Sequence, residues 1–327
     1  MMNQTVQDLL VSKKGILALD WSPTTIAKQF EAVGLRSTAE LNRIYRQMLV
    51  TTPDLNKYVS GIILHDETIN QKLDSNMSFV DYLIQQGIVA GVRGDNGSEK
   101  YKDTEQNMSY GTETLDERFK KYANLGIKFT KWRAGFKVSD IYPSDEFLDE
   151  SIKRLTEFAK ISHKYNLVPF VEPDVEIKGT HTTTRCAEIS GKILQKLFES
   201  LQSESINLSD VILKTNMILP GVDSGVIAEP LEVANATLRV YRRFVPKEVG
   251  GIVLLSGGIT YSDSTLYLDK IEDLSKNDPW KISFSFARAL QKDALAQWAG
   301  KSEMVEEAQR VLINRLQKVT KARMGEL

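Results

Sequence analysis

The chain has 327 residues, enough for one large α/β domain or two smaller ones, and it carries 42 Lys and Arg residues against 43 Asp and Glu residues. A net charge of −1 gives no overall attraction to nucleic acid or to an anionic membrane. A single cysteine, Cys186, excludes an internal disulfide, and no apolar run has the length of a membrane span or a signal sequence. We therefore expect a cytoplasmic protein that binds neither nucleic acid nor a membrane.

Eight short apolar runs follow one another along the chain, and helical patterns separate most of them. The runs begin near Gly15, Gly61, Ile88, Phe129, Val168, Val211, Gly251 and Lys281. Strands that alternate with helices at this spacing predict parallel βαβ units, and eight units close a (β/α)8 TIM barrel. Apolar residues at 3.6-residue spacing predict outer helices over 41–50, 115–125, 152–161 and 189–201.

The chain contains no Pro/Gly/Ser-rich linker, low-complexity tract or long internal repeat. We therefore expect residues 1–327 to form one barrel domain. Residues 302–327 are charged and helical in pattern, which predicts a C-terminal helical extension packed outside the barrel. Residues 94–114 are expected to form a polar loop and residues 178–184 an exposed loop.

Polar side chains stand at the carboxyl ends of these runs, where (β/α)8 barrels carry their active sites. Lys214 interrupts an apolar run that otherwise indicates a buried strand, and a buried ammonium loses hydration unless it is paired. Lys131 and Glu172 interrupt two other runs in the same way. Two lysines and a carboxylate in one pocket are what carbonyl chemistry through a Schiff base requires. The other polar strand ends are Asp20, His65, Asp66, Arg93, Arg133, Ser256 and Ser285.

Any one of these groups could instead have a structural role, capping a strand or forming an ion pair. For Asp66 or Arg93 taken alone we prefer this structural role. The combination of Lys131, Glu172 and Lys214 favours catalysis, because buried titratable clusters are enriched at active sites. Only three histidines are present, which leaves little material for a His-rich metal site.

Side-chain direction assigns roles within this cluster. Residues two apart on a strand share a face, so Lys131 and Arg133 point one way and the intervening tryptophan the other. A nucleophilic lysine must be neutral, and both burial and a neighbouring ammonium disfavour its charge. Lys131 is the expected neighbour of Lys214. Glu172 is expected to move protons during carbinolamine formation and dehydration, and Asp20 to act on a substrate hydroxyl.

The last two strand ends predict a phosphate site. Ser256 and Gly257 follow the seventh run, and Arg288 follows the eighth, where barrels often bind phosphate at a helix N-terminus. On the other side of the barrel, a second anionic group could be held by Ser22, Thr25, Lys28, Lys131 and Arg133. An ordinary capped helix start explains residues 22–28 equally well.

Together these segments resemble class I fructose-1,6-bisphosphate aldolase, from about Lys14 to Lys301. The resemblance is carried by residues 15–20, 45–47, 131–133, 168–173, 213–217, 255–258 and 284–291. It implies a (β/α)8 barrel that is usually a homotetramer, acts on a phosphorylated sugar and needs no metal or other cofactor. It also implies that Lys214 forms the imine, that Lys131 and Glu172 assist proton transfer, and that Asp20 handles the C4 hydroxyl. Ser256, Gly257 and Arg288 are implied to bind the phosphate next to the ketone.

The chain departs from the family pattern at several positions. Trp21 stands where glutamate is usual and Gln29 where a basic residue is common, and both bear on the distal phosphate. Arg93 stands where lysine is usual and is expected to bind substrate, and Asp174 replaces a second glutamate. No tyrosine follows Tyr267, so we expect enamine protonation to rely on groups in the barrel, with Glu172 the nearest by role.

The predicted function is reversible cleavage of fructose 1,6-bisphosphate to dihydroxyacetone phosphate and glyceraldehyde 3-phosphate. Trp21 and Gln29 keep open a related Schiff-base lyase that acts on another phosphorylated sugar. A non-catalytic barrel that serves as a scaffold is a third alternative, and the retained lysines argue against it.

Overall fold

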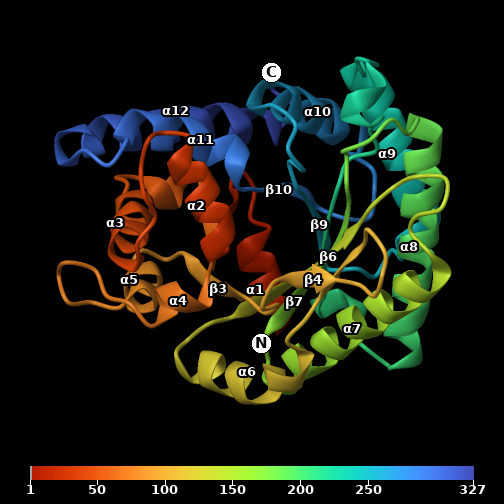
Figure 1. The fold of residues 1–327 in the computed structure, drawn as a ribbon, viewed down its shortest axis with the longest axis horizontal. Helices are drawn as coiled ribbons and strands as arrows, with labels where there is room; N and C mark the ends of the chain where they lie inside the picture. The colour runs from red at the N-terminus through yellow and green to blue at the C-terminus, as the bar shows by residue number, and fades with distance from the viewer. Residues whose placement is uncertain (1) are drawn as a thin grey trace.

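The computed structural model describes residues 2–327, in which eight parallel strands close into a barrel (Figure 1). Met1, the first residue of the expected domain, lies outside the described residues. The order of the strands around the barrel is β1-β10-β9-β8-β7-β6-β3-β2. The strands are β1 Gly15–Leu19, β2 Val59–Leu64, β3 Val89–Arg93, β6 Phe129–Phe136, β7 Val168–Val175, β8 Ile212–Thr215, β9 Gly251–Leu254 and β10 Ile282–Phe286. All eight predicted runs are confirmed as barrel strands.

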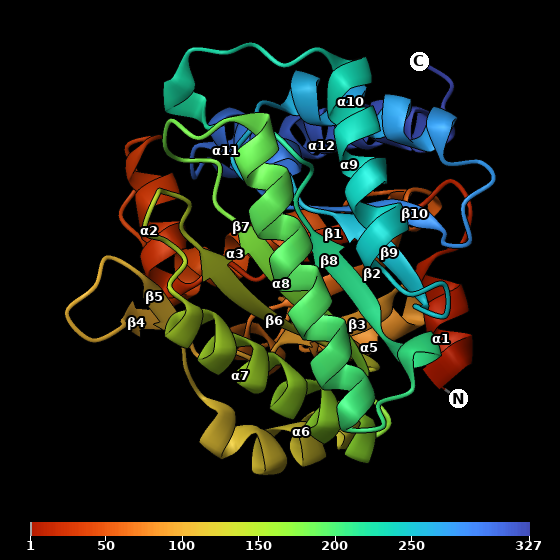
Figure 2. The same ribbon diagram turned by 90° about the vertical axis from the view of Figure 1, so that its right-hand side faces the viewer.

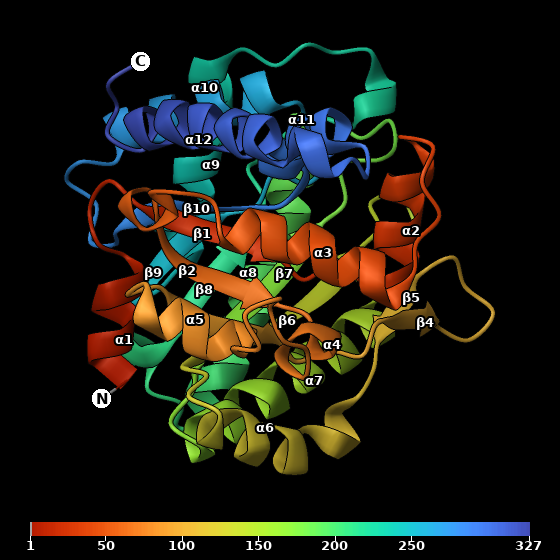
Figure 3. The same cartoon turned by 90° about the vertical axis from the view of Figure 1, so that its left-hand side faces the viewer.

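Helices surround the barrel (Figures 2 and 3). They are α1 Met2–Leu9, α2 Pro23–Glu31, α3 Ala39–Val50, α4 Asp66–Ile69, α5 Phe79–Gln85, α6 Leu115–Asn124, α7 Asp145–Lys164, α8 Thr183–Ser203, α9 Pro230–Phe244, α10 Tyr261–Leu274, α11 Arg288–Trp298 and α12 Val305–Ala322. Short 3-10 helices occur at Leu55–Lys57, Thr112–Thr114, Leu208–Asp210, Val222–Ser224 and Ser302–Met304. All four predicted outer helices are present. The pattern over 152–161 marks only part of α7, which begins at Asp145 after the cap Ser144 and ends at Lys164.

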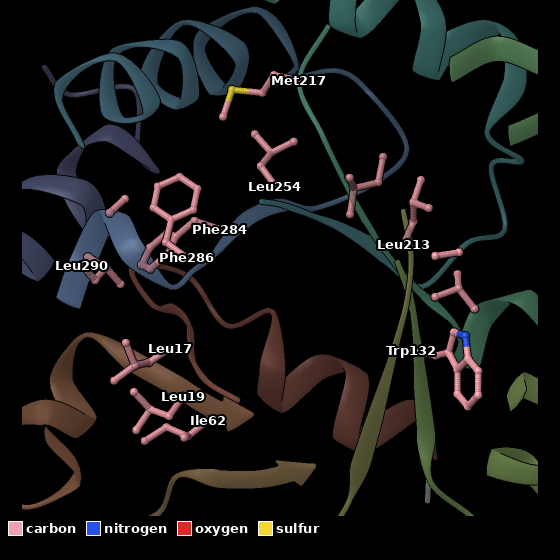
Figure 4. Packing of buried hydrophobic residues seen from close by; sticks show 14 of the residues in the cluster. Leu17, Leu19, Ile62, Trp132, Leu213, Met217, Leu254, Phe284, Phe286 and Leu290 are labelled. Carbon is pink, nitrogen blue, oxygen red and sulfur yellow. The ribbon is translucent and has the colours of Figure 1, made fainter. Parts of the chain in front are cut away.

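Strand residues alternate between two apolar layers, one facing the helices and one inside the barrel. The same alternation determines which polar side chains point into the mouth of the barrel. Side chains facing the helices belong to the wall cluster, which includes Leu19, Trp132 and Leu213 (Figure 4). Side chains of the opposite parity fill the barrel interior, as Phe129 and Ile212 do. Continuing the inward parity toward the carboxyl ends of the strands leads to Asp20, Lys131, Arg133, Glu172 and Lys214. The barrel therefore presents these five side chains at its mouth.

The amino end of the barrel is closed by the first helix. Val6 and Leu9 of α1, with Leu10 after it, belong to the interior cluster. A side chain on Gly251 would meet Leu10 at only 2.2 Å from its Cβ, so the helix packs directly against the barrel strands. One end of the barrel is thus sealed by apolar packing and the polar end is left for chemistry.

Two segments differ from the expected loops. Residues 94–114 contain an antiparallel hairpin of β4 Ser98–Lys100 and β5 Asn107–Ser109. Three-residue polar strands are too short to show an apolar alternation, which explains why the sequence did not predict them. The loop expected over 178–184 ends earlier, because α8 begins at Thr183 and Thr182 caps it. Within that loop His181 is buried, at 8% exposure.

The C-terminal extension packs on the outside of the barrel, as predicted. Helix α12 lies against α3, α10 and α11 (Figure 3). Beyond it, Arg323 is buried, and its Nε donates to Ser283 Oγ of β10 at 2.8 Å. The backbone N–H of Leu327 donates to Asp269 at 3.0 Å. Removing the residues from Lys321 onward would therefore expose a barrel strand and lower stability. Among residues 2–327, no helix combines the length and apolar character needed to cross a membrane.

Candidate active site

Four buried charged side chains meet at the mouth of the barrel, one from the end of β1 and one each from β6, β7 and β8. Lys131 Nζ lies 2.6 Å from Asp20 Oδ2 and 3.3 Å from Glu172 Oε2. The other carboxylate oxygen of Glu172 lies 3.2 Å from Lys214 Nζ. None of the four side chains is more than 9% exposed. The structure therefore brings together the four predicted catalytic residues, with Glu172 between the two lysines.

The position of Glu172 refines the expected contact between the lysines. Each ammonium or amine faces its own carboxylate oxygen, so the carboxylate separates Lys131 from Lys214. A carboxylate at 3.2 Å from the candidate nucleophile is within reach for direct proton transfer. The repulsion expected between two bare ammonium groups is thus offset by Glu172 and by Asp20.

Opposite charges together shift the pKa values of Asp20 and Lys131 more than burial does. Burial alone would raise the pKa of Asp20, but Lys131, Lys214 and Arg93 hold that pKa well below its ordinary value. Burial alone would likewise lower the pKa of Lys131, but Asp20, Glu172 and Asp95 raise it. Asp20 is therefore an anion and Lys131 a cation at neutral pH. An anionic Asp20 is the form that accepts a proton from a hydroxyl group.

Two guanidinium groups lie on the side of the mouth formed by β3 and β6. Arg93 is paired with Lys131 in strand register, and its Nη1 lies 3.4 Å from the backbone carbonyl of Asp20. Arg133 Nε donates to Asp174 at 2.7 Å. Both arginines also contact Asp95, which the sequence analysis missed. The spacing Arg-x-Asp at a strand end was the available signal, since residues two apart share a face.

The predicted phosphate site is assembled from two strand ends. Ser256 follows β9, and the next two residues, Gly257 and Gly258, have φ values of 53° and 105°. Arg288 begins α11, whose N-terminus has no side-chain cap. One guanidinium nitrogen of Arg288 lies 3.0 Å from the point where a Cβ on Gly258 would stand. Side chains at these glycines would be strained, and the exposed backbone leaves room for an anion.

The predicted anion-binding residues on α2 have a local role. Ser22 Oγ accepts from the backbone N–H of Thr25 at 3.2 Å and lies 3.0 Å from its hydroxyl. This is the capped helix start weighed as the alternative. Lys28 is exposed on the following turn. Among the described residues, no hydrogen bond or ion pair links these three side chains to the buried cluster.

Trp21, which stands where the family usually has glutamate, packs in the apolar wall of the barrel. The indole is buried in the wall cluster and stacks on Tyr45, with ring centroids 6.2 Å apart. Nearby, Arg46 Nη1 pairs with Glu67 at 2.6 Å. Asp66 accepts from the Tyr122 hydroxyl at 2.5 Å, which agrees with the structural explanation preferred for it.

The chain is similar over most of its length to known fructose-bisphosphate aldolases. The family profile described as fructose-bisphosphate aldolase class-I matches residues 1–327. Cytosolic fructose-bisphosphate aldolase 4 of Arabidopsis thaliana is 36% identical over 313 residues, which cover 95% of this chain and 80% of that protein. A probable class 1 fructose-bisphosphate aldolase of Xylella fastidiosa is 37% identical over 297 residues, 90% of this chain and 89% of the relative.

A solved structure extends the likeness to the fold. The fructose-bisphosphate aldolase of Plasmodium falciparum, crystallised with TRAP and a small-molecule inhibitor, is 34% identical and has a TM-score of 0.96. The match covers 99% of this chain and 94% of that one. The resemblance inferred from the motifs and the TIM-barrel prediction are both confirmed. The chain belongs to the class I fructose-bisphosphate aldolase family.

Proposed function

We propose that this aldolase cleaves fructose 1,6-bisphosphate reversibly to dihydroxyacetone phosphate and glyceraldehyde 3-phosphate, with Lys214 as the imine-forming nucleophile. The family acts on phosphorylated sugars in glycolysis, and the reverse direction would serve gluconeogenesis. The observation that carries the residue roles is the buried Glu172 bridge, with one oxygen 3.2 Å from Lys214 and the other 3.3 Å from Lys131. A carboxylate so placed can move protons to and from the amine without crossing solvent.

The proposed reaction begins with attack of the neutral Lys214 amine on the C2 carbonyl. Glu172 transfers protons so that the carbinolamine loses its hydroxyl as water and leaves a protonated imine. Asp20 then takes the proton of the C4 hydroxyl, the C3–C4 bond breaks, and its electron pair moves into the imine. The aldehyde departs. Glu172 returns a proton to C3 of the enamine, and water hydrolyses the imine to release dihydroxyacetone phosphate.

The two phosphates would occupy opposite sides of the mouth. Ser256, Gly257 and Arg288 would hold the phosphate next to the ketone, at the uncapped start of α11. Arg93 and Arg133 would hold the distal phosphate on the other side. The start of α2, with Ser22, Thr25 and Lys28, would complete that side of the site. Asp174, in the place of the family glutamate, fixes the guanidinium of Arg133 at 2.7 Å.

The assembly state, the compartment and the cofactor requirement are proposals drawn from the family. We propose a homotetramer in the cytoplasm, supported by the family resemblance and by the cytosolic name of the Arabidopsis relative. We also propose that residues 1–327 act as one domain without metal or other cofactor. The lysine imine supports the last point, because it supplies the electron sink that a metal provides in other carbonyl lyases.

Borohydride trapping would test the proposed function. Reduction in the presence of dihydroxyacetone phosphate should add mass to the peptide that carries Lys214. Cleavage should be faster with fructose 1,6-bisphosphate than with fructose 1-phosphate, and extensive chelation should leave the rate unchanged. Labelling of Lys131 would contradict the nucleophile, and a preference for another phosphorylated sugar would favour the related lyase. Loss of the rate on chelation, with recovery in zinc, would contradict the metal-free mechanism.

Substitution of Arg288 by alanine is expected to raise the Michaelis constants for both fructose 1,6-bisphosphate and dihydroxyacetone phosphate. The change removes a charge-assisted contact worth on the order of 2–3 kcal/mol, or roughly 30- to 150-fold in binding. Steady-state cleavage and inhibition by dihydroxyacetone phosphate would measure it. Because Arg288 is exposed, the fold should be unaffected, and Arg310→Ala on the exposed outer face of α12 is a matched control. Unchanged constants for both molecules would show that Arg288 does not hold this phosphate.

A further inference from the structure

Asp95 is a buried carboxylate that has no part in the proposed reaction. It follows β3 by two residues, and its side chain is 1% exposed. Its Oδ1 accepts from Arg93 Nε at 2.7 Å, from the Gly97 N–H at 3.3 Å and from Arg93 Nη2. Its Oδ2 accepts from the backbone N–H of Arg133 at 3.2 Å. Every neighbour donates, so only an ionised carboxylate satisfies the whole set.

The charge of Asp95 is maintained by these contacts. Burial alone would raise the pKa of Asp95, but Arg93, Lys131 and the hydrogen bonds hold it below its ordinary value. Two nitrogens of Arg93 face one carboxylate oxygen, which fixes the plane of the guanidinium. The third nitrogen, Nη1, lies 3.4 Å from the carbonyl oxygen of Asp20. Arg93 is thus held from both ends across the mouth of the barrel.

Arg133 is held by the same segment of chain. Its backbone N–H is bound by Asp95, and its carbonyl oxygen accepts from Ser109 Oγ of the hairpin at 2.5 Å. Its side chain is turned toward Asp174. Asp95 therefore connects two guanidinium groups near Lys131. It binds Arg93, which lies opposite Lys131 on β3, through its side chain, and Arg133, two residues further along β6, through its backbone.

We infer that Asp95 is a positioning residue that sets the selectivity of this aldolase for a sugar with a second phosphate. The inference rests on the proposed function, in which Arg93 and Arg133 receive the distal phosphate. Asp174 lies 2.7 Å and Glu176 3.7 Å from the Arg133 side chain and already offset its charge. Recognition of a phosphate there depends on the direction of the N–H groups more than on net positive charge, and Asp95 sets that direction for Arg93.

Asp95→Asn provides a test in which geometry and net charge predict opposite results. The substitution adds one positive charge to the site but replaces an acceptor by an NH2 group that faces other donors. If Asp95 positions Arg93, the Michaelis constant for fructose 1,6-bisphosphate should rise by roughly 10-fold or more, while kcat/KM for fructose 1-phosphate stays within about 2-fold. Borohydride trapping of dihydroxyacetone phosphate on Lys214 should be unchanged.

Two further variants separate positioning from stability. Asp210→Asn removes another buried carboxylate, at 7% exposure, next to Asn207 before β8, and should leave the ratio of the two substrates unchanged. If Asp95→Asn does not fold, Asp95→Glu keeps the charge but moves it by one methylene, and should show the same selective loss to a smaller degree. Equal losses on both sugars, or tighter binding of the bisphosphate, would overturn the positioning role while leaving the proposed function intact. Failure of the wild-type protein to cleave either sugar would overturn both.

Discussion

Replacement of Lys214 by arginine is expected to abolish cleavage of fructose 1,6-bisphosphate, with kcat reduced by roughly 10⁴-fold or more. Arginine carries a positive charge that can pair with Glu172, whose carboxylate lies 3.2 Å from the lysine nitrogen. Its guanidinium remains protonated at any working pH, so it has no lone pair with which to attack C2. The substitution therefore removes the covalent step and leaves a group that can still contact Glu172.

Single-turnover and steady-state rates on the folded variant would measure this effect. Lys281→Arg is the matched control, because Lys281 is exposed and precedes β10 at the closed end of the barrel. The control should cleave at the wild-type rate. Binding of the bisphosphate to Lys214→Arg should persist, since Ser256, Gly257 and Arg288 are untouched. More than about 1% of the wild-type rate in this variant would mean that the imine forms elsewhere or that none is needed.

The barrel and the centre of its site could be predicted from the sequence because both depend on alternation. A strand buried on two faces has few reasons to carry Lys131, Glu172 or Lys214, so each charged residue indicated a paired group that faces a functional site. The alternation also separated Arg133 from Trp132. The wall cluster bears this out, with Trp132 among the helix-facing residues and 0% exposed (Figure 4).

Features set by tertiary contacts could not be predicted in this way. The Arg-x-Asp spacing could mark Asp95 as a partner of Arg93, but only the approach of the β6 backbone shows that it also binds the N–H of Arg133. The hairpin at 98–109 consists of short polar strands with no periodic signal. Trp21 was weighed as a change in the distal phosphate site because it stands where the family usually has glutamate. Only the packed structure shows that the indole fills space beside Tyr45.

Substitution of Lys131 by methionine is expected to lower kcat by roughly 10²- to 10⁴-fold and to change its pH dependence. Lys131 lies 2.6 Å from Asp20 and is the first of the cations that hold the pKa of this carboxyl below its ordinary value against the effect of burial. Without it, burial is opposed mainly by Lys214 and Arg93, so the pKa of Asp20 should rise. Asp20 acts as a base only when ionised, so the acid limb of kcat/KM should move to higher pH.

The same change should affect stability in a pH-dependent way. The lowered pKa of Asp20 in the folded wild-type protein contributes stability that is fully present above the ordinary carboxyl range and is lost as the pH falls through the folded pKa. Removing one partner of a buried charge pair costs about 3–5 kcal/mol, because the other charge is left without compensation. Lys131→Met should therefore be destabilised most at neutral pH and less near pH 4, where the unpaired carboxylates can take up protons.

Urea denaturation at the two pH values, together with a pH profile of kcat/KM, would measure both effects on one protein. Lys153→Met is the control, because this lysine is exposed on α7 and the exchange adds the same apolar side chain without removing a buried charge. Its unfolding free energy and its pH profile should match those of the wild type. If kcat falls in Lys131→Met while the acid limb stays in place, then Lys131 is not the counter-charge that keeps Asp20 ionised. Its contribution would then lie in proton transfer through Glu172, which is 3.3 Å away on its other side.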